Sequence, residues 1–171
     1  MDLFGKITEG RNLLEKIGSK IPGYSGYKER EDRRQADRIL RQTIAARYEE
    51  QWARISGLQR QLLEEGGIEH VDRLEAAAIK LRTFVDQVKT ASYGYSGFFD
   101  AVKVNEKELA ALYDFDNQLL QNIEAVKAAV DNVEASLSSD GLPAAARHLT
   151  SLAQECNETF EKRNDVLTAS N

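Results

Sequence analysis

The sequence predicts an all-α protein, an antiparallel bundle of about five helices with two long helices and glycine-aromatic corners. Three observations support this fold class. Helix-forming residues dominate the composition, and only two prolines occur in 171 residues. Apolar residues recur at steps of three and four over long stretches, whereas no stretch alternates with the period of two that a strand requires. Short segments containing glycine join these stretches, which places consecutive helices side by side.

The first predicted helix covers about residues 2–20 and ends at Pro22-Gly23. Three glycines within it each weaken a helix by up to about 1 kcal/mol, so the helix needs a surface on which to lie. We treat residues 1–22 as an amphipathic element beside a bundle of residues 23–171, within a single domain overall. The apolar side of the helix is formed by Leu3, Ile7, Leu14, Ile17 and Ile21, with Phe4 and Leu13 at its margins.

Two long helices are predicted next, over about residues 27–65 and 68–92, and Gly66-Gly67 joins them as a tight antiparallel pair. The second carries a heptad seam, which is typical of near-parallel bundle packing. At about 1.5 Å per residue, the first helix is about 58 Å long and the second about 37 Å. The N-terminal third of the first should therefore overshoot its partner by roughly 20 Å. The helix over residues 2–20 is long enough to fold back over this overhang.

The last two helices are predicted to begin near Asn105 and Pro143. Asn105 can cap the first of them while Glu108 reaches back, and proline suits the first turn of the second. One of the two acidic residues beside Phe115 must lie near the apolar seam, where a carboxylate needs a partner such as arginine or tyrosine. We interpret Asp116 as this structural polar contact.

Two segments of similar sequence form the predicted corners, Gly23-Tyr24-Ser25-Gly26-Tyr27 and Gly94-Tyr95-Ser96-Gly97-Phe98. Glycine permits turn geometries that other residues avoid, and serine can cap the following helix. The similarity indicates a degenerate helix-corner-helix repeat. The corner aromatics either pack inward, which we favour, or form an exposed patch for a partner. The candidate partner-binding residues are Tyr24, Tyr27, Tyr93, Tyr95, Phe98, Phe99, Arg30 and Arg34.

Charge is distributed unevenly along the chain, whose net charge is −5. Residues 1–60 contain 13 Lys and Arg against 9 Asp and Glu, whereas residues 61–171 contain 10 against 19. An anionic partner would therefore meet the N-terminal third, although a solvated helix of mixed charge is the interpretation we favour. Acidic residues interrupt the basic run between Lys28 and Arg41, so we do not expect nucleic-acid binding.

No pattern of catalytic, cofactor-binding or metal-ligating residues stands out. Neither His70 nor His148 has the Glu three residues earlier that a di-iron bundle uses, and no phosphate-binding glycine loop occurs. The single cysteine, Cys156, excludes an internal disulfide and falls on an apolar stripe, where it fills the core. We therefore expect a non-enzymatic protein with no cofactor and no metal.

The leading functional hypothesis is a helical interaction or assembly module. The long helices and the heptad seam suit a protein that binds a partner protein or self-associates. The contact surface would be the aromatic corners or the overhang of the long helix.

A second hypothesis is a peripheral membrane protein anchored by the first helix. Over about twenty residues, the start of the chain resembles the N-terminal amphipathic helix of phage-shock membrane-repair proteins, although the corner after it and the short hairpin depart from that family's pattern. The resemblance implies contact with an anionic membrane surface. The candidate membrane-facing residues are Leu3, Phe4, Lys6, Ile7, Leu14 and Ile17. Packing of this helix against the bundle is the alternative.

A third hypothesis is an enzyme or small-ligand binder with a site inside the bundle. The chain shows no signal peptide and no apolar stretch of the length that spans a membrane. We therefore expect a cytoplasmic protein, lying at the inner face of the membrane if its first helix is an anchor.

Overall fold

A computed structural model describes residues 3–91, 96–101 and 103–169, with only the backbone described for residues 3–9 and Ser96. The predicted all-α fold class is confirmed, since the described residues contain helices and no strand. The helices are α1 (Leu3–Lys20), α2 (Arg33–Glu64), α3 (Ile68–Thr90), α4 (Ser96–Asp100), α5 (Glu106–Ser136) and α6 (Leu142–Thr168), with a 3-10 turn η1 (Arg30–Asp32) before α2.

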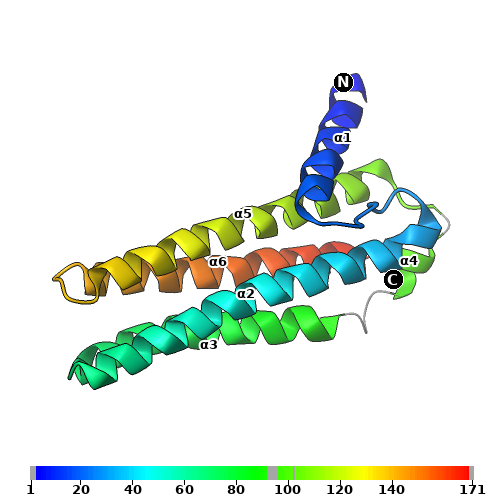
Figure 1. Ribbon diagram of the computed structural model, residues 1–171. Coiled ribbons are helices and arrows are strands. Elements are labelled where there is room, and N and C mark those ends of the chain that lie inside the picture. Colours follow the sequence, from blue (N-terminus) through cyan, green and yellow to red (C-terminus); the bar gives the residue numbers. More distant parts are fainter. Residues whose placement is uncertain (1–2, 92–95, 102, 170–171) are drawn as a thin grey trace.

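The four longest helices form the bundle, as two antiparallel hairpins packed against each other (Figure 1). Helix α2 pairs with α3 and α5 pairs with α6, while α3 also packs on α6 and α2 on α5. Both hairpins turn at the same end of the bundle. We call the opposite end the corner end, because α4, the C-terminal end of α1 and the segment between α1 and α2 all gather there.

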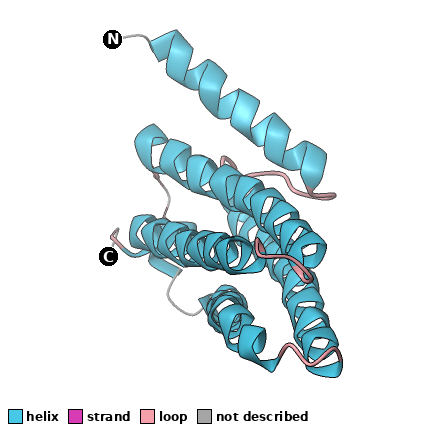
Figure 2. Ribbon diagram, turned by 90° about the vertical axis from the view of Figure 1, so that its left-hand side faces the viewer, coloured by secondary structure: helices cyan, strands magenta, loops and turns pink. Residues whose placement is uncertain are grey.

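Helix α1 lies outside this four-helix arrangement and contacts α5 (Figure 2). It does not run along the start of α2, and its N-terminal end points away from the bundle (Figure 1). Its C-terminal half is nevertheless part of the core, because Ile17 is fully buried and Ile21, just after the helix, is 1% exposed. Arg47 of α2 also donates a hydrogen bond to the carbonyl of Lys20 (2.7 Å), which fixes the end of α1.

The predicted start of the first long helix at Tyr27 is wrong, because α2 begins six residues later, at Arg33. The backbone is extended at Glu29 (φ −85°, ψ 125°), and the short turn η1 then leads into α2. The cause is tertiary, since the Tyr27 amide donates to the hydroxyl of Tyr113 and its carbonyl accepts from Arg33, at 2.7 and 2.8 Å. With 32 residues in α2 and 23 in α3, the difference in length is about 14 Å and not the predicted 20 Å.

The start of α5 matches its prediction. The side chain of Asn105 accepts a hydrogen bond from the amide of Glu108 (2.8 Å), and the Glu108 carboxylate accepts from the amide of Asn105 (3.3 Å). This reciprocal capping box satisfies amides that the first helical turn leaves unpaired. It fixes the position at which the chain leaves the corner end and enters the bundle.

Candidate binding groove beside a buried ion-pair network

A buried network of charged and phenolic groups lies at the corner end of the bundle. We call it the ion-pair network, and its members are Tyr27, Asp37, Arg41, Asp116 and Arg163. Arg163 of α6 is fully buried and donates to Asp116 of α5 (Nε to Oδ1, 2.5 Å) and to Asp37 of α2 (Nη2 to Oδ1, 2.7 Å). Arg41 donates to the other oxygen of Asp37 at 2.7 Å. Three of the four bundle helices therefore contribute charge to one interior cluster.

Two guanidinium groups and two carboxylates make up the charges of this network, so they balance in sign. A buried ion would otherwise lose several kcal/mol of hydration without compensation. Burial raises the pKa of Asp116, and the adjacent Arg163 guanidinium and the Tyr27 hydroxyl oppose that rise. The predicted role of Asp116 as a structural polar contact is confirmed, with an arginine and a tyrosine as its two partners.

Tyr27 connects the network to the first corner. Its hydroxyl donates to Asp116 (2.5 Å) and accepts from Arg163 (3.1 Å). Burial, reinforced by the negative charge of Asp116, raises the pKa of Tyr27 well above its usual value, so the phenol keeps its proton. The ring also packs with those of Tyr113 and Phe99, at centroid separations of 5.3 and 6.4 Å.

The described aromatic residues of the two corners do not form an exposed patch. Tyr24, Tyr27, Phe98 and Phe99 are between 0% and 8% exposed, which is the inward packing that we favoured. The prediction that these four residues form an exposed patch for a partner is therefore wrong. Tyr27 is held inward by its hydrogen bonds to Tyr113 and Asp116 of α5. The four rings also pack on one another, Tyr24 and Phe99 on Tyr27 and Phe98 on Phe99. Tyr93 and Tyr95 lie outside the described residues.

The two candidate arginines lie at the surface. Arg30 is exposed within η1. Arg34, at the start of α2, forms a two-pronged ion pair with Asp100 at the end of α4, at 2.7 and 3.3 Å. This contact joins the overhang of α2 to α4.

The candidate membrane-facing residues separate into two groups along α1. Leu14 is half-buried and Ile17 is fully buried against the bundle. The prediction that Ile17 faces a membrane is therefore wrong. Ile17 faces inward because α1 packs on α5. For Leu3, Phe4, Lys6 and Ile7 the structure describes the backbone alone, in the part of α1 that leads away from the bundle (Figure 1).

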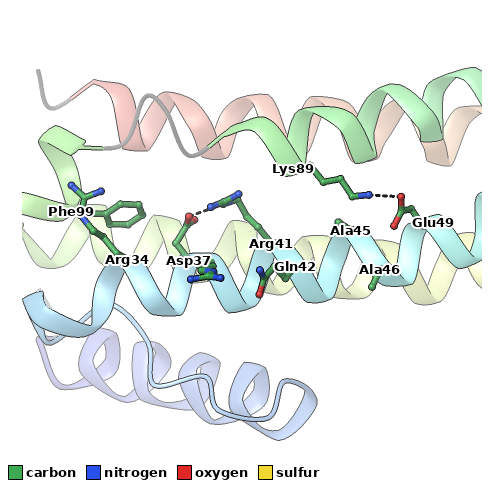
Figure 3. Close-up of a pocket in the computed structure, with 10 residues that line it drawn as sticks. Arg34, Asp37, Arg41, Gln42, Ala45, Ala46, Glu49, Lys89 and Phe99 are labelled. Carbon is green, nitrogen blue, oxygen red and sulfur yellow. Dashed lines mark hydrogen bonds and ion pairs between the residues drawn. The ribbon is translucent and has the colours of Figure 1, made fainter.

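A groove of about 560 Å³ follows α2 beside the network, which we call the α2 groove (Figure 3). Arg34, Arg38 and Arg41 of α2 are among its lining residues, with Asp37 and Glu49 of the same helix. Lys89 extends from the end of α3 toward Glu49 (Figure 3). Ala45 and the ring of Phe99 add apolar surface. The lining of the groove thus holds four cations, two carboxylates and a small apolar area.

Ion pairs fix most of the charges that line the α2 groove. Arg41 is paired with Asp37, Lys89 with Glu49, and Arg34 with Asp100. Arg41 also donates to the carbonyl of Val88 (3.1 Å), which ties the wall of the groove to α3. Arg38 is exposed and forms no ion pair within the described ranges, so it is the cation that is free to meet an anion from outside.

Cys156 lies in the core, as predicted. Its sulfur is 3.3 Å from the hydroxyl of Tyr48, which also donates to the carbonyl of Leu119. Burial raises the pKa of the Cys156 thiol to about 12, opposed by its contact with Tyr48. Such a thiol stays protonated near neutral pH, which suits a packing residue.

In the part of the chain that the structure describes, no group of three or more His, Cys, Asp or Glu side chains could hold a metal ion. None of the described helices is both long and apolar enough to cross a membrane.

Comparison of the chain with models of protein families, with curated proteins and with solved structures finds no match.

Sequence reasoning missed Arg163, Asp37 and Arg41 as members of the network, although each lies in register with an apolar stripe. Arg163 lies three residues after Phe160 and four before Leu167, both of which are buried. Steps of four and three also lead from Asp37 to Arg41 and on to a buried isoleucine. Charged residues at helical core positions were therefore the available signal.

Proposed function

We propose that this chain is a non-enzymatic interaction module that binds an acidic segment of a protein partner in the α2 groove. The observation that carries the proposal is the groove itself, where exposed Arg38 lies between two cations already held in place, Arg34 and Arg41. A carboxylate entering there pairs with Arg38, the one of these three guanidinium groups that no carboxylate in the described part of the chain already neutralises. Charge complementarity of this kind selects partners and raises association rates.

The rigidity of the α2 groove supports binding. Arg41 is held by Asp37 and by the carbonyl of Val88, and Asp37 is held in turn by buried Arg163. Phe99 is buried against Tyr27. Because these groups are already ordered, a ligand would lose little conformational entropy in them on binding. Phe99 and Ala45 line the groove but are each only 3% exposed, so they offer one small apolar contact beside the acidic group.

The test is selection of binders from a library of random twelve-residue peptides displayed on phage, with the full chain as target. We expect enriched peptides to combine Asp or Glu with an apolar residue. For a synthetic peptide from that selection, Arg38→Glu should weaken binding at least tenfold, or about 1.4 kcal/mol. The matched control is Arg147→Glu, an exposed arginine of α6 away from the groove.

Two results would overturn this proposal. One is enrichment of basic or purely apolar peptides, and the other is equal weakening by Arg38→Glu and Arg147→Glu. Self-association through the same groove is the other form of an assembly module. Light scattering of the wild type and of Arg38→Glu distinguishes self-association from binding of a different protein. A wild-type dimer that dissociates in this variant would show that a second copy of the chain occupies the groove.

The second candidate function is membrane anchoring by α1. The observation that favours it is the N-terminal end of α1, which leads away from the bundle while the C-terminal half packs on it (Figure 2). Flotation with anionic liposomes tests this idea. Because Ile17 and Ile21 belong to the core, the comparison uses a chain lacking residues 1–9. Flotation of the full chain alone supports an anchor, and flotation of neither chain contradicts it.

A further inference from the structure

We propose that a second cleft at the corner end binds an oxyanion attached to an apolar group. We call it the pre-α5 cleft, since the segment leading into α5 forms much of it. Its volume is about 790 Å³. Three cations, Lys28, Arg33 and Lys103, and three apolar residues, Phe98, Val104 and Leu109, line it. This volume lies within the range of small-molecule sites in proteins.

Arg33 lines the cleft although the residue is only 4% exposed. Its guanidinium donates to two backbone carbonyls, those of Tyr27 (2.8 Å) and Ala101 (2.9 Å). It contacts no carboxylate in the part of the chain that the structure describes. A buried cation whose partners are neutral lacks the compensating charge that buried ions normally have. An oxyanion in the cleft would supply that charge.

The other charges of the cleft favour the same ligand. Lys28 and Lys103 are both exposed, and neither forms an ion pair within residues 3–91, 96–101 and 103–169. Glu108 also lines the cleft, but its carboxylate accepts from the amide of Asn105 in the capping box of α5. Cations in the lining therefore outnumber the carboxylate by three to one.

The apolar residues define the rest of the ligand. Phe98 is almost fully buried, whereas Val104 and Leu109 are half-buried at the surface of the cleft. An aliphatic group of the ligand would remove the exposed parts of Val104 and Leu109 from water, at about 25 cal/mol per Å² of apolar area. The ligand therefore carries an oxyanion at one end and an apolar body at the other.

This site is separate from the α2 groove. No residue lines both clefts. Of two arginines adjacent in sequence, Arg33 lines the pre-α5 cleft and Arg34 lines the α2 groove. The inference goes beyond the proposed docking function, and either proposal can fail while the other stands.

Isothermal titration calorimetry of the full chain with sodium octanoate, below its micelle concentration, tests the inference. Acetate tests the charge alone, and octan-1-ol tests the apolar group alone. We expect octanoate to bind at least tenfold more tightly than either. Amide shifts in nitrogen-15 NMR spectra should gather at Val104 and Leu109.

Charge reversal at the exposed lysines completes the test, because Arg33 also ties Tyr27 to Ala101 and its loss could disturb the fold. Lys28→Glu and Lys103→Glu should each weaken octanoate binding at least tenfold. Lys127→Glu, an equal charge change on the exposed face of α5, should alter it less than twofold. Equal binding of octanol or acetate, equal effects of the three variants, or no octanoate binding would each overturn the proposal.

Discussion

At the scale of single residues, the pair of Asp116 and Arg163 is the feature on which the corner end depends. Both side chains are fully buried, and together they connect α5, α6, α2 and the corner at Tyr27. Burying this pair in place of apolar residues gains little free energy of folding, because the desolvation of two ions offsets their attraction. Removal of one partner is different, since it leaves the other ion buried and unpaired.

The first prediction follows from this asymmetry. Arg163→Met should lower the free energy of unfolding by about 3–5 kcal/mol, because it leaves the Asp116 and Asp37 carboxylates without their shared cation. Urea denaturation followed by circular dichroism measures the change. The control is Arg147→Met on the exposed face of the same helix, which should change stability by less than about 0.5 kcal/mol. Similar stability of the two variants would contradict the role of the pair.

A second prediction concerns Cys156. Its folded pKa of about 12 lies above that of a thiol in an unfolded chain, about 8.5. The unfolded state therefore loses this proton first as pH rises. The protonated thiol makes its full contribution to the free energy of unfolding below about pH 8.5, and this contribution declines as pH rises toward 12. Over that window the wild type should lose up to about 1.4 kcal/mol of stability per pH unit more than Cys156→Ala. Denaturation of both proteins at pH 8, 9 and 10 measures the difference, and parallel pH profiles would contradict it.

At the scale of elements, the sequence was sufficient wherever local signals acted alone. The capping residues at Asn105 and Glu108, the apolar periodicity of the bundle helices and the Gly66-Gly67 turn all appear as predicted. The predicted start of α2 was wrong because the true start depends on partners far along the chain. The hydroxyl of Tyr113 accepts a hydrogen bond from the amide of Tyr27, 86 positions earlier, and no local sequence pattern predicts that contact.

The candidate site shows the same division. Asp116 could be predicted because a carboxylate beside an apolar seam requires a partner. The α2 groove could not be predicted, because it depends on where α4 places Phe99 and where the last turn of α3 places Lys89. The sequence predicted that arginines near residue 34 bind a partner, but it could not predict which of them form ion pairs. Helix packing pairs Arg34 and Arg41, whereas Arg38 is exposed without an ion pair in the described part of the chain.

The third prediction compares two glycines with the same backbone geometry. Gly26 and Gly66 have φ of +82° and +81°, a region that costs other residues about 1–2 kcal/mol. A Cβ at Gly26 would lie 2.6 Å from atoms of both Leu14 and Tyr113, whereas one at Gly66 would meet nothing within 4 Å. Gly26→Ala should therefore lower the free energy of unfolding by about 1–3 kcal/mol more than Gly66→Ala.

Urea denaturation of these two alanine variants measures the difference. Because the backbone cost is common to both, the comparison isolates the close packing between α1, the first corner and α5. Equal losses in the two variants would show that this packing is absent.

At the scale of the whole molecule, the C-terminal end of α1, the start of α2 and α4 gather at the corner end (Figure 1). Residues of α2 and α4 line both the α2 groove (Figure 3) and the pre-α5 cleft. The ion-pair network holds the α2 groove through Asp37 and Arg41. Arg33, in the next cleft, holds the backbone of Tyr27, a member of the same network. Disruption of the network should therefore weaken both sites together.

The fourth prediction tests whether α1 is an integral part of the bundle. Ile17→Ala should lower the free energy of unfolding by about 2–5 kcal/mol, because Ile17 is fully buried against the core. Ile79→Ala on α3 is the control, since Ile79 is 56% exposed, and it should change stability by about 0.5 kcal/mol or less. Thermal denaturation compares the two, and equal effects would contradict the packing of α1.

The most direct test of the central claim, that the α2 groove binds an acidic segment, is a charge-swap cycle. A selected peptide and the same peptide with its acidic residue changed to lysine are each titrated with the wild type and Arg38→Glu. The account predicts that each single change weakens binding at least tenfold and that both changes together restore most of it, a coupling of about 2 kcal/mol or more. Additive losses, or an acidic peptide that binds Arg38→Glu as tightly as the wild type, would contradict it.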